Sequence, residues 1–280
     1  MGKIAIIGLG LIGGSIGLAV RRAEPVDTEV IGYDRDPEVA ARAIEFRAVQ
    51  KLAPSLEAAA EEATMVVIAT PVISIRRIFE TIGPRLQRNA LITDTASTKG
   101  EVLRWAREFL PSTVNFVGGH PMAGKEQSGP QAAEESLFDG KPYCIVPSVD
   151  ATRGAVNAVV SFAEALGAAP FFLDADEHDA YAAAISHVPL VASIGLFNLA
   201  YNSSAWPELA SMSGSGFKDL TRLASGEPEM AHDIFITNRT HVLHWLDRYI
   251  SELQKLAALI EKDDREALFR HIAETQLERD

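Results

Sequence analysis

The sequence predicts an α/β fold in which a mostly parallel, helix-covered sheet is followed by an all-α half. Continuous apolar runs rich in Val and Ile are typical of strands buried on both faces. Seven such runs occupy the first half, at Ile4–Ile7, Glu29–Tyr33, Met65–Ala69, Ala90–Thr93, Val114–Val117, Tyr143–Val146 and Phe171–Leu173. Stretches with helical spacing separate most of them, and this alternation predicts βαβ units.

The pattern changes near Asp174. From Asp176 onward only long helical periods are found, so we expect two domains, residues 1–174 and residues 175–280. In the second domain, apolar residues step by three and four over about five turns, at Val242, Leu246, Tyr249, Leu253, Leu256 and Ile260. Little sheet remains to cover this stripe. We therefore expect a homodimer through the helical domain, with burial inside the same domain as the alternative.

Composition limits the classes of function. The 280 residues are 47% hydrophobic and 23% charged, which is typical of a globular protein with a core. A formal net charge of −12 makes nucleic acid an unexpected partner. The single cysteine, Cys144, lies in an apolar run and is expected to be a core thiol. Neither a secretion signal nor about eighteen uninterrupted apolar residues are present, so we expect a cytoplasmic protein without a membrane span.

A glycine-rich turn follows the first predicted strand and opens the first predicted helix, with the sequence Gly8-Leu9-Gly10-Leu11-Ile12-Gly13. Gly8 permits a tight turn, Gly10 lets the backbone approach a pyrophosphate, and Gly13 allows close packing of helix on strand. The N–H groups at the start of the helix, near Leu11 and Ile12, favour phosphate. The pattern predicts a Rossmann-type dinucleotide site; the alternative is a turn that binds nothing.

Asp34 ends the second predicted strand, where a carboxylate accepts hydrogen bonds from ribose hydroxyls and repels a 2′-phosphate. It favours NAD. The neighbouring Arg35 could hold that phosphate, which keeps NADP as an alternative. Thr70 and Pro71 end another strand at the edge expected to face the cofactor, although they could form a simple strand-to-helix turn.

Two further predicted strands run into polar loops at the same edge, residues 94–100 and 118–124. The second loop carries His120, and a histidine in a cofactor cleft is a natural general base because its ordinary pKa lies near the working pH. Ser97 in the first loop could orient the imidazole. The alternatives are an ordinary loop histidine and a Ser97 that caps a helix, and Thr98 with Glu101 predicts a capping box there.

These segments resemble the prephenate and arogenate dehydrogenases of tyrosine biosynthesis. The resemblance spans both domains in order, and its loop segments are more specific than the nucleotide fingerprint. The matching segments are GLGLIGGS at Gly8–Ser15, DTASTKG at Asp94–Gly100, GGHPMAGKEQSG at Gly118–Gly129, SHVP at Ser186–Pro189 and GFKDLTRLA at Gly216–Ala224.

The resemblance implies an NAD-dependent oxidative decarboxylation of prephenate to 4-hydroxyphenylpyruvate and CO2, or of arogenate to tyrosine. It implies that His120 takes the proton of the ring hydroxyl as hydride leaves the same carbon. Ser97 would bridge His120 and the nicotinamide, and Arg222 would grip the ring carboxylate with two hydrogen bonds. A surface ion pair with Asp219 is the alternative for Arg222.

The resemblance also implies roles for three further residues. His187 would bind near the side-chain carboxylate, although a lone histidine on an alanine-rich helix is also a common core residue. Lys218 would add positive potential, and Glu126 would gate the pocket. For both, the alternative is a solvated surface side chain.

Two departures concern the substrate end. The family's Pro-x-Met-Trp reads Pro-Glu-Met-Ala here, ending at Ala231, and the last position of its Ser-His-x-Pro-His is Leu190. The choice between prephenate and arogenate therefore stays open. His241, His244 and Asp247 share a helix face, but a fourth ligand is not evident, so we expect no metal site.

Two other functions remain as alternatives. One is a different two-domain hydroxyacid dehydrogenase, in which a lysine of the helical domain is the typical catalytic acid or base. The other is a catalytically silent, nucleotide-sensing dimer.

Overall fold

The computed structural model describes residues 2–23, 28–61, 63–125, 127, 129–262 and 264–279. Its first half is one eight-stranded sheet in the order β3-β2-β1-β4-β5-β6-β7-β8, parallel except for the β6–β7 pair. The strands are β1 (Lys3–Ile7), β2 (Glu29–Tyr33), β3 (Lys51–Leu52), β4 (Met65–Ile68), β5 (Leu91–Asp94), β6 (Asn115–Pro121), β7 (Pro142–Pro147) and β8 (Ala169–Phe172). The predicted mostly parallel sheet is confirmed.

Two strands differ from the sequence prediction. The two-residue β3 is exposed and too short to produce an apolar run. Strand β6 does not end at Val117 but continues to Pro121, because antiparallel pairing with β7 extends it and places His120 opposite Cys144. His120 therefore lies in a strand rather than in the loop after one. Cys144 is buried, as predicted.

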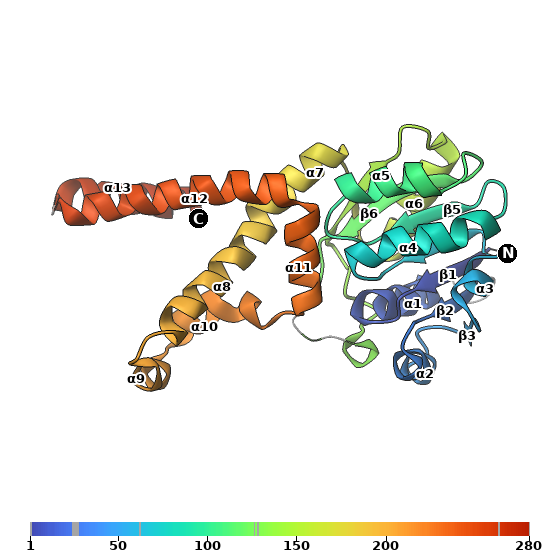
Figure 1. Ribbon diagram of the computed structural model, residues 1–280, viewed down its shortest axis with the longest axis horizontal. Helices are drawn as coiled ribbons and strands as arrows, with labels where there is room; N and C mark the ends of the chain where they lie inside the picture. Colours follow the sequence, from blue (N-terminus) through green and yellow to red (C-terminus); the bar gives the residue numbers. More distant parts are fainter. Residues whose placement is uncertain are drawn as a thin grey trace.

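Helices cover both faces of the sheet (Figure 1). Alternate residues of each strand point to opposite faces, so Ile6 joins one core cluster while Ala5 and Ile7 join the other. The first cluster packs under α1 (Leu11–Ala23), α2 (Pro37–Glu45) and α6 (Arg153–Ala165). The second packs under α3 (Leu56–Glu61), α4 (Val72–Ile82) and α5 (Gly100–Phe109).

The described residues after β8 form only helices, which confirms the predicted all-α second half. These are α7 (Ala175–Ala182), α8 (Val188–Tyr201), α9 (Trp206–Met212), α10 (Ser215–Thr221), α11 (Pro228–Thr237), α12 (Arg239–Glu261) and α13 (Arg265–Arg279). A π-helical turn, Ala183–His187, joins α7 to α8. Pro189 follows it and has no N–H to donate to this turn, a common cause of such irregularity.

Two aspartates of the helical half hold the N-termini of two sheet helices. Asp179 of α7 accepts hydrogen bonds from the backbone N–H groups of Lys99 (2.7 Å) and Gly100 (2.8 Å), at the start of α5. Asp233 of α11 accepts one from Ile73 (3.0 Å), in the first turn of α4. Because the helices that follow parallel strands begin at the carboxyl edge of the sheet, these contacts place the helical half against that edge.

The capping box predicted for Thr98 and Glu101 is wrong. No side-chain capping bond is made by Lys99, the residue before α5, and Thr98 Oγ1 instead lies 2.9 Å from Thr237 Oγ1 in α11. Glu101 pairs with Arg104 on the surface. The cap of α5 comes from Asp179, a residue about 80 positions along the chain, and a local capping pattern cannot reveal such a contact.

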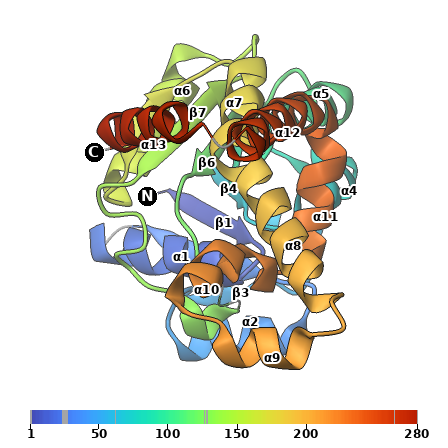
Figure 2. The ribbon, with the colours of Figure 1, turned by 90° about the vertical axis from the view of Figure 1, so that its left-hand side faces the viewer.

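Apolar surface remains exposed on the helical half of the single chain. Figure 1 shows α12 and α13 extending away from the sheet, and Figure 2 shows the same helices in front of it. Of the predicted stripe in α12, only Val242 is buried, while Leu253 is 48% and Ile260 is 60% exposed. Burial of the stripe inside its own domain is therefore wrong for the single chain.

One helical run, Ala175–Tyr201, is long and apolar enough to cross a membrane by length and composition alone. Only 28% of its most apolar 18-residue stretch is buried within the chain. It packs on one side against α10, α12 and the 3-10 turn Arg222–Ser225. Its α7 portion also contacts α5 and β7, while Ile185 (69%) and Leu199 (76%) remain exposed in the single chain.

Candidate active site

The glycine turn has the geometry that the sequence predicts. Gly8 has a φ of +91°, a region that L side chains rarely adopt. A Cβ on Gly13 would overlap the carbonyl oxygen of Gly8, whereas a Cβ on Gly10 would meet nothing within 4 Å. The helix is thus packed closely on the strand, and the backbone at Gly10 is open to a ligand. Leu11 and Ile12 are the first residues of α1.

The carboxylate of Asp34 is fixed beside this turn. Its Oδ2 accepts a hydrogen bond from the N–H of Leu9 (2.8 Å), and its Oδ1 accepts one from the N–H of Asp36 (2.9 Å). Each oxygen retains a further lone pair for a ribose hydroxyl. Arg35 is 76% exposed and lies 3.4 Å from Glu229 of α11, so its guanidinium faces a carboxylate from the helical half.

Thr70 and Pro71 close the same side of the turn. A Cβ on Gly8 would lie 2.8 Å from the methyl carbon of Thr70, so these two residues are in contact. Thr70 Oγ1 accepts a hydrogen bond from Ser74 (2.8 Å), and Pro71 directly precedes α4. The structure therefore brings the predicted cofactor residues together around the end of β1.

His120 belongs to a buried chain of three side chains. Its Nδ1 lies 2.9 Å from Nε2 of His178, and Nδ1 of His178 lies 2.8 Å from Oδ1 of Asp179. No hydrogen bond joins His120 to Ser97 among the described residues, so in this structure His178 rather than Ser97 contacts the imidazole. The pKa of His120 is held well below 6.5, first by burial and then by the neighbouring basic groups His178, Lys99 and His187.

Asp179 is ionised at neutral pH. Burial acts to raise the pKa of its carboxyl group, but a hydrogen bond from His178 and the backbone N–H groups of Gly100 and Lys99 outweigh burial and lower that pKa. Asp179 thus contacts the candidate base through His178 and the sheet through α5. His178 and Asp179 could not be predicted from the sequence, because nothing in a helical stretch such as Ala175–Ala182 links it to a strand about 60 residues earlier.

His187 is buried beside this chain at the end of the π-helical turn. Asn238 Nδ2 donates to the carbonyl oxygen of Asp179 (2.7 Å) and lies 3.1 Å from His187 Nδ1. His187 Nδ1 then accepts, which leaves the proton on Nε2, an atom that is buried and unpartnered among the described residues. Burial lowers the pKa of His187 to about 4, so the ring is a neutral hydrogen-bond donor.

A buried ion pair holds the strand that carries His120. Lys99 Nζ donates to Asp94 and to the carbonyl oxygen of Gly119 (2.7 Å), while Asp94 Oδ1 accepts from the N–H of Gly119 (3.1 Å). The side chains of Lys99 and Asp94 are both fully buried. Both residues stand in the segment Asp94–Gly100, but the sequence analysis gave them no role because their partner is backbone on another strand.

The remaining predicted residues are not part of this buried cluster. Lys218 lies in α10 and Arg222 directly follows it, and both are exposed in the single chain. Glu126 lies outside the described residues. Among those described, no three His, Cys, Asp or Glu side chains form a metal-binding group; His241 contacts Asp176 and His244 contacts Arg248.

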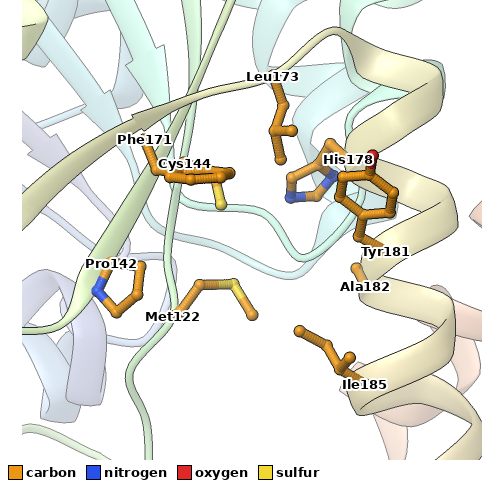
Figure 3. A pocket seen from close by; sticks show the side chains of 9 residues that line it. All are labelled: Met122, Pro142, Cys144, Phe171, Leu173, His178, Tyr181, Ala182 and Ile185. Atoms are coloured by element: carbon orange, nitrogen blue, oxygen red, sulfur yellow. The ribbon is translucent and has the colours of Figure 1, made fainter.

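His178 also lines an apolar pocket of about 190 Å³ (Figure 3). Its walls come from the loop after β6, from β7, from β8 and its following residue, and from the helical run that begins with α7. They are Met122, Pro142, Cys144, Phe171, Leu173, His178, Tyr181, Ala182 and Ile185. His178 therefore contacts the candidate base and also lines an apolar pocket.

Comparisons with known proteins agree with this geometry. Residues 16–171 match the family model for the prephenate dehydrogenase nucleotide-binding domain, and residues 174–274 match the model for its dimerization domain. The prephenate dehydrogenase of Bacillus subtilis (strain 168) is 36% identical over 270 residues, which cover 96% of this chain and 72% of that protein.

Two solved structures share the whole architecture. Prephenate dehydrogenase from A. aeolicus, in complex with hydroxyphenyl propionate and NAD+, superimposes with a TM-score of 0.93 at 28% identity, covering 100% of this chain and 97% of that one. Synechocystis arogenate dehydrogenase gives a TM-score of 0.82 at 29% identity, covering 99% and 98%.

Proposed function

The chain belongs to the prephenate dehydrogenase family, and we propose that it oxidises prephenate, arogenate or both with NAD as the hydride acceptor. One observation of the structure supports this most directly. A buried imidazole, His120, has its pKa well below 6.5 and lies at the end of β6, at the same sheet edge as the glycine turn. An uncharged ring in that place can accept a proton at neutral pH.

The described residues fit a bound NAD. The open backbone at Gly10 and the start of α1 would receive the pyrophosphate, and Asp34 would accept the ribose hydroxyls. Arg35, which would favour NADP, faces Glu229 instead. Thr70 and Pro71 would border the nicotinamide side of the turn. When bound, NAD accepts hydride from the hydroxyl-bearing ring carbon of the substrate.

His120 performs the proton transfer in this scheme. It removes the hydroxyl proton as a carbonyl forms at the same carbon, so that carbon loses hydride and the oxygen loses a proton. This carbonyl is conjugated to the carbon that bears the ring carboxylate, so the bond between that carbon and the carboxylate can break and release CO2. The electrons of the broken bond complete the aromatic ring. Ser97, partly buried in the loop after β5, would contact the same hydroxyl or the nicotinamide.

Three residues are proposed for the substrate's carboxylates, and a fourth for the entrance of the pocket. Arg222 would bind the ring carboxylate, with Lys218 adding positive potential. His187 would donate its unpartnered Nε2–H near the side-chain carboxylate, as a neutral group rather than a cation because its pKa is about 4. Glu126 would gate the pocket.

We further propose a cytoplasmic homodimer formed through the helical half, without nucleic acid or membrane as partners. The exposed apolar residues of α12 and the match to a dimerization domain support the homodimer. A partner copy would also cover the open surface of the run Ala175–Tyr201. Dimerisation would then account for the apolar composition of this run without a membrane.

The test is a comparison of prephenate and arogenate, each with NAD and with NADP, followed by the absorbance of the reduced cofactor. We expect turnover with NAD and at least one substrate. His120→Asn should lower kcat by at least about 100-fold while the Kd for NAD stays near the wild-type value. Turnover retained by His120→Asn would exclude this base, and no turnover with any of the four pairs would favour a silent nucleotide sensor.

A further inference from the structure

The chain His120–His178–Asp179 restricts where its protons lie. The Asp179 carboxylate only accepts hydrogen bonds, and it already accepts two from the start of α5. The proton in its 2.8 Å contact with His178 therefore belongs to His178 Nδ1. The remaining question is which ring carries the proton in the 2.9 Å contact between His178 Nε2 and His120 Nδ1.

Two arrangements satisfy that contact. If His178 is neutral, its Nε2 is a lone pair, so His120 must donate from Nδ1 and keep Nε2 free of a proton. If His178 is a cation, its Nε2 donates, and a neutral His120 must carry its proton on Nε2. Only the first arrangement leaves His120 able to accept a proton at Nε2, the ring nitrogen without a protein partner among the described residues.

We propose that His178 and Asp179 are positioning residues that hold His120 in its Nδ1–H form, with Nε2 ready to take the substrate's proton. The inference rests on the proposed function, because it concerns the base of that reaction. It assigns a role to two residues of the helical half that do not themselves touch the reacting atoms. It also explains why a carboxylate is buried behind two histidines.

The contacts of His178 fit the first arrangement. The side chain is 1% exposed, and the groups that face it are His120, Asp179, the nearby His187 and Lys99, and the pocket wall with Tyr181 and Cys144. The Asp179 carboxylate already has three hydrogen-bond donors. One proton on His178 Nδ1 serves Asp179 and the bare Nε2 accepts from His120, so the first arrangement satisfies both neighbours of the ring.

The chain contains a matched control. His232 and Asp233 repeat the His–Asp doublet on α11: His232 Nδ1 lies 3.1 Å from Asp233 Oδ1, and Asp233 accepts from the start of α4. The side chain of His232 is 66% exposed and does not contact His120 in the described structure. It therefore shares the local pairing and the helix-capping neighbour of His178 without the link to the base.

The experiment reads the ring protons directly. The protein has seven histidines, and ¹⁵N-histidine NMR distinguishes Nδ1–H from Nε2–H in each neutral ring. We would compare the wild type with His178→Leu, which removes the acceptor, and with His178→Gln, whose side-chain oxygen can replace it. His232→Leu is the control. The kcat and the Kd for NAD of each variant accompany the spectra.

We expect Nδ1–H at His120 in the wild type and in His178→Gln, and Nε2–H in His178→Leu. The kcat should fall about 100-fold in His178→Leu, recover to within about tenfold of wild type in His178→Gln, and stay unchanged in His232→Leu, with the Kd for NAD constant throughout. If His178 only supported the fold, its replacement would not move the proton on the His120 ring, and His178→Gln would not restore kcat.

Nε2–H at His120 in the wild type would overturn the proposal, and so would a His178→Leu protein with unchanged ring and kcat. The wild-type spectrum decides the position of the proton even if His178→Leu does not fold. Because it is recorded without substrate, it is independent of the proposed function, which fails separately if the wild type oxidises neither prephenate nor arogenate.

Discussion

Lys99 is the residue whose burial has the largest consequence for the site. Its ammonium group lies against the Asp94 carboxylate with both side chains fully buried, and together they hold the N–H and the carbonyl of Gly119, next to His120. Tyr143 and the backbone of Asp94 leave no room for a Cβ at position 119. The position of the base is thus set by residues that never reach the substrate.

Removing Lys99 should therefore be costly. Lys99→Met leaves the Asp94 charge buried without its partner, and we expect the free energy of unfolding to fall by about 3–5 kcal/mol. Urea unfolding followed by circular dichroism measures it. The control is Lys51→Met, which breaks a largely exposed pair with Glu29 and should cost about 1 kcal/mol or less. Equal losses in the two variants would contradict this account of the pair.

At this scale the sequence pointed to the residues proposed to carry the chemistry but not to those that hold them. His120 and His187 stand in segments with recognisable neighbours. His178 does not, because its partner is 58 residues away and belongs to another half of the molecule. Asp94 and Lys99 lie in a segment that the sequence analysis quotes. Their roles depend on contacts with a different strand, however, and the spacing of residues along the chain cannot predict those contacts.

The elements follow a similar rule. Every predicted strand is present, since an apolar run buried on both faces is a local signal. The extension of β6 to Pro121 comes from its pairing with β7. The cap of α5 comes from Asp179 rather than from Thr98 and Glu101. Boundaries and caps made by distant partners are the parts of the fold that the sequence alone did not predict.

Two glycines of one turn should separate packing from cofactor binding. Gly13→Ala places a Cβ against the carbonyl of Gly8, so we expect a loss of about 1–3 kcal/mol in unfolding free energy as well as weaker NAD binding. Gly10→Ala meets nothing in the protein and should keep its stability while the Kd for NAD rises at least about tenfold.

Thermal unfolding and titration of NAD against tryptophan fluorescence give both quantities for each variant. Wild-type affinity in Gly10→Ala would show that the pyrophosphate does not approach the backbone at this position. An undisturbed Gly13→Ala would show that α1 can move away from β1 without loss.

The whole molecule leaves its apolar helical surface open in one chain. Only Val242 of α12 is buried, and on α13 Phe269 and Leu277 are 73% and 79% exposed. Contiguous apolar surface of this kind is typical of an interface. A dimer is therefore expected to be the stable form of the protein rather than an occasional association.

Leu253→Glu should weaken that dimer. A charge in the apolar stripe of α12 is expected to raise the dimer dissociation constant by roughly 30-fold, about 2 kcal/mol, as measured by sedimentation equilibrium. Val149→Glu is the matched control, because Val149 is 86% exposed on the sheet half. A Leu253→Glu protein that dimerises like the wild type would move the interface away from α12.

The two aspartates that reach from the helical half to α4 and α5 also limit how the molecule can move. If the sheet half and the helical half moved apart, α4 and α5 would both lose the aspartate that accepts a hydrogen bond from their N-terminal turn. The loss would cost about 1 kcal/mol for each helix. Such a movement would also remove from the Asp179 carboxylate the two backbone N–H groups that stabilise its charge. Any opening between the halves therefore carries the loss of both caps, and we expect turnover to proceed with the two halves held together.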